Sequence, residues 1–362
     1  MKKLLITIDF PPNVGGVARY LKNICKYSKD EIVVLAPQTE TDFDAKQNYK
    51  IYRKKLLFKY FWPKWLPIFW HTYKIIKKEK IQKIEISHVL PVGYAVLVFK
   101  KFLKLPYRVY THGLDVKSPR NNPRKFRLMK KVLSGAEEII ANSEFTKKEL
   151  LKIGVLEEKI TLIYPCLDPD DYKTPSAEEI KKIREKYHLN NKKVLLTVGR
   201  LVARKGQDKV IEALPEILKE IPDLLYLVAG DGEYRKNLEN LVKQNNLEKN
   251  VIFTGRAEDS ELPALYSLSD VFIMIPRELE DGDVEGFGMV YLEANYFGKP
   301  VIGSDSGGAG EAVERGINGL LVNPEKEEEI KRAVFKIFKD EHLYKELSGE
   351  GKKRVEEKFL CK

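Results

Sequence analysis

Two glutamates eight residues apart, in a stretch that also holds two glycines, are the clearest candidates for chemistry in this chain. They are Glu285 and Glu293 of the sequence EGFGMVYLE. We expect Glu285 in a loop and Glu293 a little over one turn into the following helix, so the two do not share a helix face. Carboxylates accept hydrogen bonds from vicinal hydroxyls, and amides at Gly286 and Gly288 can bind negative charge. The pattern favours two contacts with one extended ligand, although acidic residues also occur near helix starts because of the macrodipole.

Three cations surround two glycines in a second stretch, VGRLVARKG at residues 198–206. It follows a predicted strand, so the cations lie at the carboxyl end of that strand. This arrangement suits a diphosphate, since Arg200 can bind through its planar fork and Lys205 as a mobile point charge. The alternative is a solvated basic loop. Arg204 is the cation that we most expect to be merely solvated.

Two further features follow strands in the first half of the chain. Gly15 and Gly16, in NVGGV, lie between a first strand and a helix, where backbone without Cβ can approach an anion. A simple tight turn is the alternative. His112 ends another strand beside Gly113, a placement that favours a site over an ordinary structural histidine.

Short apolar runs that alternate with helical patterns must position these residues. Several runs are continuous Val, Ile and Leu, which is typical of parallel strands covered on both faces. The first predicted set is Leu4–Ile8, Ile32–Leu35, Ile84–Val89, Arg108–Thr111, Glu138–Ala141 and Ile160–Ile163. The second is Val194–Val198, Leu225–Ala229, Val251–Thr254, Val271–Ile275 and Val301–Gly303. The fold class is therefore α/β, with two Rossmann-like domains facing across a cleft that holds the ligand near the strands' carboxyl ends.

Length and charge distribution support a division into domains. A chain of 362 residues is too long for one ordinary core, and its composition excludes wholesale disorder, collagen and coiled coil. We place the first domain at residues 1–170, the second at 171–345 and a carboxyl-terminal helix, a shortened crossover, at 346–362. Residues 1–170 carry 33 Lys and Arg against 17 Asp and Glu, a charge of +16. The remainder carries 31 against 36, a charge of −5.

Cysteine use and hydropathy predict the surroundings of the protein. Cys25, Cys166 and Cys361 are so widely spaced that we expect neither a disulfide framework nor a zinc site, which favours a reducing compartment. The opening MKKLLITI ends at Asp9, too early for a signal peptide, and reads as a buried strand. No run of 18 uncharged apolar residues occurs, so we expect no membrane-spanning segment.

A basic aromatic segment, residues 50–80, contains ten Lys or Arg, one Glu and all three tryptophans, Trp62, Trp65 and Trp70. Aromatic rings favour the bilayer interface and cations favour anionic headgroups, so we predict docking on an anionic membrane surface. One alternative is core-facing aromatic rings beside a solvated charged helix. Another is single-stranded nucleic acid, which no recognition module supports.

Taken together, the motifs resemble those of the retaining family-4 glycosyltransferases of the GT-B fold, and the resemblance covers essentially the whole chain. It runs through DFPPNVGGVARYL, THGLD, ANSEFTKKEL, VGRLVARKGQD, AGDGEYR, VIFTGR, EGFGMVYLEA and GKPVIGSDSGGAGEAV. IDFPPNVGG and DVEGFGMVYLEA look most similar to the bacterial mannosyltransferases that extend phosphatidylinositol mannosides from GDP-mannose. Family members usually continue with a helix that crosses back to the first domain, whereas this sequence stops at Lys362.

The resemblance implies catalytic roles for four residues at matching positions. Glu285 is similar to the glutamate that contacts donor-sugar hydroxyls, and His112 to the histidine near the transferred sugar. Arg200 and Lys205 match the pair that neutralises the diphosphate. Donor-binding roles follow for the remaining matching residues, namely Gly15, Gly16, Gly286, Phe287, Gly288 and Glu293, of which Glu293 matches the residue that holds the ribose.

The implied activity is transfer of a hexose, with retention, from a nucleotide sugar to a membrane-associated lipid or glycan. GDP-mannose is the expected donor, and a UDP-sugar is the alternative donor. Two alternative functions remain, a nucleotide-sugar epimerase and a basic binding protein without turnover. We expect no cofactor and no metal, since Asp281-Gly282-Asp283 reads as an acidic loop rather than a Mg²⁺ site. The expected location is cytoplasmic, peripheral at the inner face of the membrane, without a nucleic-acid partner.

Overall fold

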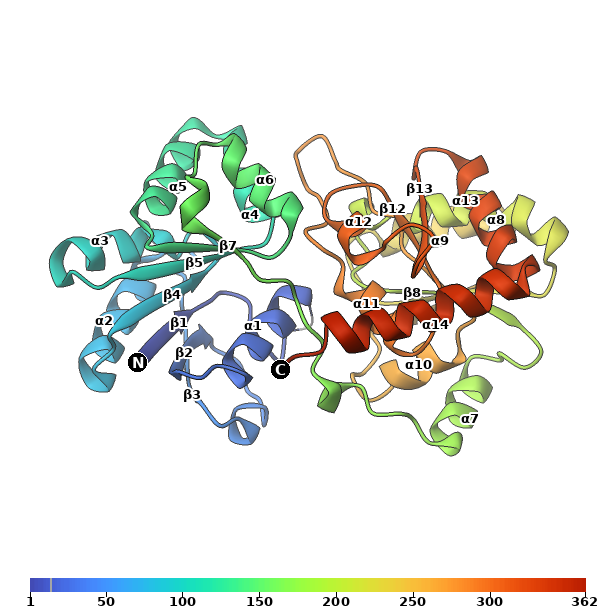
Figure 1. Ribbon diagram of the computed structural model, residues 1–362, viewed down its shortest axis with the longest axis horizontal. Helices are drawn as coiled ribbons and strands as arrows, with labels where there is room; N and C mark the ends of the chain where they lie inside the picture. The colour runs from blue at the N-terminus through green and yellow to red at the C-terminus, as the bar shows by residue number, and fades with distance from the viewer. Residues whose placement is uncertain (14) are drawn as a thin grey trace. The chain divides into compact units, whose positions relative to one another are not determined.

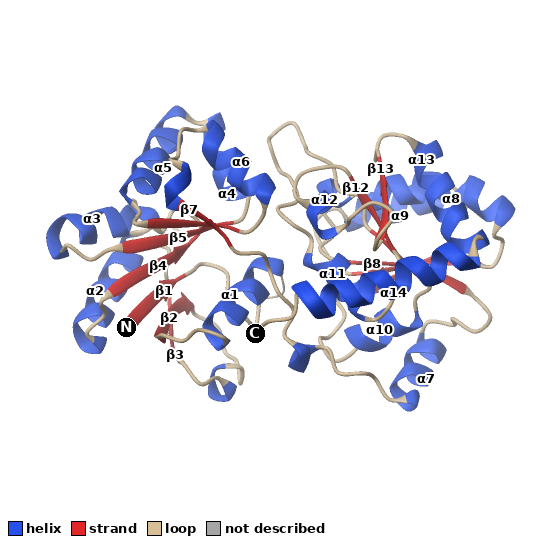
Figure 2. Ribbon diagram, in the orientation of Figure 1, coloured by secondary structure: helices blue, strands red, loops and turns tan. Residues whose placement is uncertain are grey.

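The computed structural model describes residues 1–13 and 15–362, which divide into two compact units (Figure 1). The first unit comprises Met1–Pro165, Asp281–Gly286 and Lys362, and the second comprises Cys166–Glu280 and Phe287–Cys361. In each unit the strands form a central layer between helices (Figure 2). The α/β class and the two-sheet layout predicted from the sequence are confirmed. The predicted domain limits at 170 and 345 stay predictions.

The first unit contains a seven-stranded parallel sheet in the order β3-β2-β1-β4-β5-β6-β7. Its strands are β1 (Lys2–Ile6), β2 (Glu31–Pro37), β3 (Lys50–Lys54), β4 (Lys83–Ser87), β5 (Tyr107–Thr111), β6 (Glu138–Ala141) and β7 (Ile160–Leu162). Its α-helices are α1 (Gly16–Lys26), α2 (Leu66–Glu79), α3 (Gly93–Leu103), α4 (Leu114–Lys117), α5 (Pro123–Gly135) and α6 (Glu144–Lys152). Strand order reverses between β1 and β4, the position where ligands bind in sheets of this type.

Successive side chains of each strand in this unit point to opposite faces of the sheet, so apolar side chains are buried on both faces. Leu4 and Ile6 belong to a buried cluster with apolar side chains of α2, α3 and α5. Leu5, between them, is equally buried but lies outside that cluster. Because successive side chains of a strand point to opposite faces, Leu5 covers the other face. Burial on both faces explains the continuous apolar runs in the sequence.

The second unit contains a six-stranded parallel sheet in the order β10-β9-β8-β11-β12-β13, with the reversal between β8 and β11. Its strands are β8 (Lys193–Val198), β9 (Leu224–Ala229), β10 (Val251–Gly255), β11 (Val271–Ile273), β12 (Val301–Ser304) and β13 (Gly319–Val322). Its α-helices are α7 (Ala177–Lys186), α8 (Gln207–Glu220), α9 (Arg235–Gln244), α10 (Leu262–Leu268), α11 (Met289–Tyr296), α12 (Ala309–Ala312), α13 (Glu327–Lys339) and α14 (Glu341–Lys358). Short 3-10 turns complete both units.

A disulfide joins two of the three cysteines, a single bond that the sequence analysis, which predicted no disulfide framework, did not foresee. Cys166 and Cys361 are bonded, with Cα atoms 5.1 Å apart, while Cys25 is a buried free thiol. The main chain on either side is also paired: Leu167 N–H donates to Phe359 O at 2.7 Å and Cys361 N–H donates to Leu167 O at 2.9 Å. Nothing in the sequence indicates this bond, because the two cysteines are 195 residues apart along the chain and come together only when the chain folds.

Candidate functional site

The basic loop of the second unit packs tightly against the end of β11, at the reversal of strand order. Gly206 has φ of 77°, and a Cβ there would lie 2.1 Å from Ile275 O, so only glycine fits. Arg277 N–H donates to Arg204 O at 2.8 Å, which fixes the loop from its other side. The loop therefore occupies the carboxyl edge of the sheet, as the sequence predicts for an anion-binding segment.

The two residues predicted to bind the diphosphate, Arg200 and Lys205, differ in their exposure to solvent. Lys205, at the end of a 3-10 turn (Ala203–Lys205), is only 9% exposed, whereas Arg200 is exposed. Nearby, the Asp208 carboxylate accepts two hydrogen bonds from Arg277, at 2.9 and 2.7 Å. These bonds raise the pKa of the Arg277 guanidinium and hold the start of α8 beside residue 277. A buried lysine on a loop fixed in this way is suited to meet a dianionic leaving group.

Glu293 is buried within the second unit rather than displayed on its surface. Its side chain accepts a hydrogen bond from Tyr266 Oη at 2.7 Å, and the residue is 1% exposed. It lies on α11, which begins after Gly288 and is fixed by a hydrogen bond of 2.6 Å from Tyr291 Oη to Met274 O. Phe287 is buried and its ring lies 6.0 Å from that of Phe359. The helical position predicted for Glu293 is correct, and its ribose role stays a prediction.

His112 lies at the carboxyl end of β5 in the first unit and is hydrogen-bonded on its ring. Its Nε2 is 2.9 Å from Ser87 Oγ, and the same hydroxyl is 3.2 Å from His88 Nδ1. His112 N–H donates to Asp115 Oδ1 at 2.8 Å. Burial holds the pKa of His112 well below its ordinary value, and the neighbouring His88 acts in the same direction. His112 is therefore a neutral, oriented group.

The loop with Glu285 belongs to the first unit, although its sequence neighbours belong to the second. Gly286 passes so close to the main chain after β5 that a Cβ would lie 2.2 Å from His112 O. Asn121 Nδ2 donates to Asp281 O at 2.9 Å at the start of this loop. The structure thus brings Gly286 to His112 and places Glu285 on the same packed segment.

The glycine loop after β1 leads into α1 as predicted. Gly15 precedes the helix, whose first residue is Gly16. A Cβ at Gly15 would lie 3.9 Å from Asp9 Oδ2, so a carboxylate is the nearest side chain to this backbone. Val14, in the same motif, lies outside the described residues. Gly15, Gly16, His112, Glu285 and Gly286 are thus in the first unit, and Arg200, Lys205, Phe287, Gly288 and Glu293 in the second.

Sequence reasoning missed three side chains near these residues. His88 and Asp115 flank His112 as described above, and Arg277 fixes the basic loop. A signal was available for His88, because it lies near the carboxyl end of the predicted strand Ile84–Val89, the same end of the sheet as His112. None was available for Arg277, since its partner Asp208 is 69 residues away along the chain.

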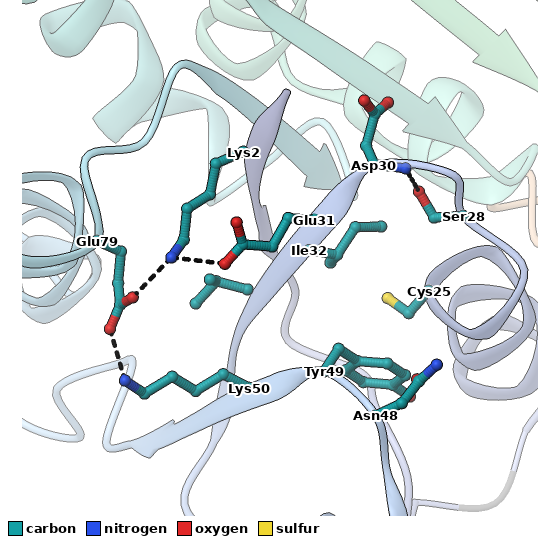
Figure 3. Close-up of a pocket in the computed structure, with 11 residues that line it drawn as sticks. Lys2, Cys25, Ser28, Asp30, Glu31, Ile32, Asn48, Tyr49, Lys50 and Glu79 are labelled. Atoms are coloured by element: carbon teal, nitrogen blue, oxygen red, sulfur yellow. Dashed lines mark hydrogen bonds and ion pairs between the residues drawn. The ribbon is translucent and has the colours of Figure 1, made fainter.

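A cavity of about 410 Å³ opens at the opposite, amino-terminal edge of the first unit's sheet (Figure 3). Its lining includes Lys2, Glu31 and Lys50, the first residues of their strands, and none of the predicted site residues. Glu79 accepts hydrogen bonds from Lys50, Tyr52 and Lys2, which lower its pKa to about 2. These ion pairs join strand starts to the end of α2, so we assign this edge a structural role.

Comparison with protein families matches both halves of the chain to glycosyltransferases. Residues 14–171 match the family described as "Glycosyltransferase Family 4", and residues 179–354 match "Glycosyl transferases group 1". A GDP-mannose-dependent alpha-(1-6)-phosphatidylinositol monomannoside mannosyltransferase of Mycolicibacterium smegmatis is 28% identical over 93% of this chain and 89% of its own. An uncharacterized glycosyltransferase of Methanocaldococcus jannaschii is also 28% identical, over 99% of this chain and 94% of its own.

Solved structures agree on the fold. The Anabaena protein HepE, in complex with UDP and glucose, matches with a TM-score of 0.84 at 22% identity, over 100% of this chain and 96% of its own. A sucrose-phosphate synthase of Thermosynechococcus elongatus matches with a TM-score of 0.81 at 20% identity, over 99% and 95%. At these identities the likeness supports the fold alone.

Proposed function

Because this chain belongs to the family-4 glycosyltransferases of the GT-B fold, we propose that it transfers a hexose from a nucleotide sugar to a membrane-associated lipid or glycan. Mannose from GDP-mannose is the proposed donor group, supported by relatives named as GDP-mannose-dependent mannosyltransferases at 28% identity. The observation that carries the proposal is the buried Lys205 and the exposed Arg200 on one closely packed loop, at the edge of the sheet where strand order reverses.

Lys205 and Arg200 supply the chemistry that such a transfer needs. As the bond between the anomeric carbon and the diphosphate breaks, negative charge accumulates on the leaving group. A guanidinium and an ammonium stabilise that charge most when they are already in place. We propose that this pair does so without a metal and that the anomeric configuration is retained. Glu285 and the neutral His112 then orient the sugar hydroxyls.

A nucleotide screen tests the donor. A nucleotide that binds only the native protein should raise its free energy of unfolding, by about 2.7 kcal/mol at a concentration of about 100 Kd. We expect GDP and GDP-mannose to raise the melting temperature more than UDP, UDP-glucose or ADP do. Thermal shift measures binding, and release of GDP with phosphatidylinositol monomannoside as acceptor measures turnover. A selective response to UDP would contradict the GDP assignment and leave the glycosyltransferase assignment in place.

We further propose that the protein docks on an anionic membrane surface through the basic aromatic segment. Within it Tyr60, Phe61 and Trp62 are 81%, 72% and 90% exposed, and Trp70 on α2 is 54% exposed. Trp65 differs, since its ring lies 5.6 Å from that of Tyr94 and packs toward the core. Exposed aromatic rings that lie among lysines are typical of a segment that binds the bilayer interface, since the rings favour the interface and the lysines favour anionic headgroups. No helix in the described part of the chain is long and apolar enough to cross a bilayer.

Vesicle binding tests the docking surface. Replacing Tyr60, Phe61 and Trp62 together by alanine should weaken binding to vesicles of phosphatidylglycerol and phosphatidylcholine about tenfold. Raising the salt concentration should weaken binding of the wild type as well, because surface charges are screened. Leu156→Ala removes an apolar side chain that is 57% exposed elsewhere in the same unit, and is the matched control. If the triple variant cosediments with the vesicles as well as the wild type does, these three rings do not contribute to membrane docking.

The inner face of the cell membrane remains the proposed location. The Cys166–Cys361 disulfide does not support a reducing compartment, since disulfides are rare in most reducing compartments. The exposed rings and lysines of the basic aromatic segment are what support a location at a membrane surface.

A further inference from the structure

Helix α14 packs against α11, the helix that follows the EGFG motif at residues 285–288 (Figure 1). Ser348 Oγ of α14 donates to Gly298 O, just after α11. Three residues later, a Cβ at Gly351 would lie 2.7 Å from Asn295 Nδ2 in α11. Because later residues of α14 meet earlier residues of α11, the two helices run antiparallel, and the end of α14 lies where α11 begins.

Phe359, which directly follows α14, contacts the EGFG motif. Its ring lies 6.0 Å from that of Phe287 between centroids, and the two residues are 6% and 2% exposed. Phe287 and Gly288 lead directly into α11, whose first residue is Met289. Protein interiors are closely packed, so a buried ring at this point restricts the path that the main chain takes into the helix.

The disulfide restrains the main chain next to Phe359. Cys361 is bonded to Cys166, and Leu167 N–H donates to Phe359 O at 2.7 Å. Main-chain hydrogen bonds contribute little net stability, because water competes for the same groups. The disulfide therefore adds a covalent restraint to a segment that hydrogen bonds alone would hold less firmly.

Arg354 of α14 restrains the ring of Phe359. Its guanidinium carbon lies 4.8 Å from the centre of that ring, within the range of a cation–π contact. The same guanidinium donates to Ala312 O at 3.1 Å and to Glu311 O at 2.9 Å, both in α12. Phe359 thus joins the motif to a side chain that is itself fixed, and all of these residues belong to the second unit.

The start of α11 lies at the same edge of the sheet as the basic loop. Tyr291 Oη of α11 donates to Met274 O, and Gly206 of the loop packs on Ile275 O, one residue further on. Both elements therefore contact the chain just after β11, where strand order reverses. Free N–H groups at a helix start bind negative charge, so the position of this start bears on the binding of a diphosphate.

We propose that Phe359 is a positioning residue for the nucleotide-sugar donor, which acts through Phe287 and is held in place by the disulfide between Cys166 and Cys361. It rests on the proposed glycosyl transfer and makes donor binding sensitive to the redox state of the two cysteines. Phe359 itself contacts no donor atom. It holds the main chain of Phe287 and Gly288 in the binding conformation before the donor arrives, which lowers the cost of ordering this segment on binding.

Reduction of the disulfide is a two-electron step. A dithiol such as dithiothreitol supplies two electrons and two protons, so that Cys166 and Cys361 become thiols and the dithiol becomes a cyclic disulfide. The reduced protein loses the covalent restraint on Phe359. Its affinity for the donor should therefore fall.

Phe359→Ala tests the positioning role and leaves both cysteines in place. Residues that orient the ligands of metal sites change affinity by about tenfold to a hundredfold when they are replaced, and we expect the lower end of this range here. The KM for GDP-mannose and the Kd of GDP, measured by calorimetry, should both rise about tenfold. The KM for phosphatidylinositol monomannoside should not change, since only the donor motif loses its support. Phe359→Leu keeps most of the apolar volume and should restore most of the donor affinity.

Phe338→Ala is the matched control for loss of packing. Phe338 is a partly buried phenylalanine of α13 that packs against the core of the same unit. Its replacement should lower the melting temperature and leave the KM for GDP-mannose unchanged. The comparison separates positioning of the donor motif from stability of the unit.

The disulfide is tested by reduction. Dithiothreitol should raise the KM for GDP-mannose in the wild type and have no further effect in Phe359→Ala, because perturbations that act through one contact are not additive. Cys25→Ala leaves the bond intact and should respond to dithiothreitol as the wild type does.

Hydrogen exchange supplies a measurement that needs no substrate. Main-chain amides of residues 287–293 should exchange faster in Phe359→Ala than in the wild type, and at the wild-type rate in Phe338→Ala. Unchanged exchange in Phe359→Ala would show that Phe359 does not hold the motif.

The kinetic outcomes differ in what else they affect. A wild-type donor KM in Phe359→Ala, or an acceptor KM that rises as much as the donor KM, overturns the positioning role and leaves the glycosyltransferase assignment in place. A donor KM of the wild type that does not respond to dithiothreitol overturns the role of the disulfide. A wild-type protein that turns over no nucleotide sugar contradicts the proposed function and the role of Phe359 together.

Discussion

Replacing Lys205 by alanine should lower turnover about a thousandfold while the fold persists. Lys205 is 9% exposed on a loop that packs against the end of β11, so its ammonium is preorganised for the leaving diphosphate. Removing one preorganised electrostatic contact of this kind lowers kcat by about a hundredfold to a thousandfold. We expect the upper end of this range because burial strengthens the interaction with the phosphate charge.

Two variants separate the charge of Lys205 from its packing. Lys205→Met keeps most of the buried aliphatic stem and should lose as much turnover as the alanine variant. Lys219→Ala removes an exposed lysine of α8, with 68% of its side chain accessible, and should change nothing. Nucleotide release and circular dichroism are measured on each protein. Full turnover in the methionine variant would show that the ammonium is not needed.

The substitution Glu285→Ala extends the test to the first unit, because Glu285 belongs to that unit and Lys205 to the second. We expect turnover to be lost and nucleotide binding to be kept, since Glu285 is proposed to contact sugar hydroxyls rather than phosphate. Full turnover in both Lys205→Ala and Glu285→Ala would contradict the site assignment as a whole.

Removing the disulfide should lower the free energy of unfolding by about 5 kcal/mol. Cys166 and Cys361 are 195 residues apart, and closing so long a loop removes that much conformational entropy from the unfolded chain in the chain-entropy model. The double variant Cys166→Ser, Cys361→Ser is compared with the wild type by urea unfolding, each with and without reductant.

The third cysteine supplies the control for this experiment. Cys25→Ala changes a buried side chain without touching the bond and should stay sensitive to reductant. Denatured, unreduced wild-type protein should show one reactive thiol, and three after reduction. Three thiols before reduction would contradict the bond, and equal stability with and without reductant would contradict its contribution.

Every central strand could be predicted from the sequence, whereas two of the four edge strands were missed. All eleven predicted strands are present, nine of them central strands, which need apolar residues on both faces. The two strands that were missed, β3 and β13, each form one outer edge of their sheet, while the edge strands β7 and β10 were predicted. β3 reads KIYRK, and charge of this kind suits an edge strand, which has one side open to solvent.

The site was predictable where a motif is local and not where it depends on packing. Gly206 and Lys205 lie in one short stretch, and the structure keeps them together on one loop. The EGFG motif is equally local, yet its first half packs in one unit and its second half in the other. His88 meets His112 only through Ser87 and the pairing of β4 with β5, so sheet order had to be known first.

The bond between Cys166 and Cys361 also changes the topology of the chain, because it turns residues 166–361 into a covalently closed ring. The segment Asp281–Gly286 belongs to that ring by sequence and to the first unit by packing. A protease that cuts the chain once within this segment opens the ring and releases no fragment. The nicked protein should migrate as one chain until a reductant separates its two pieces.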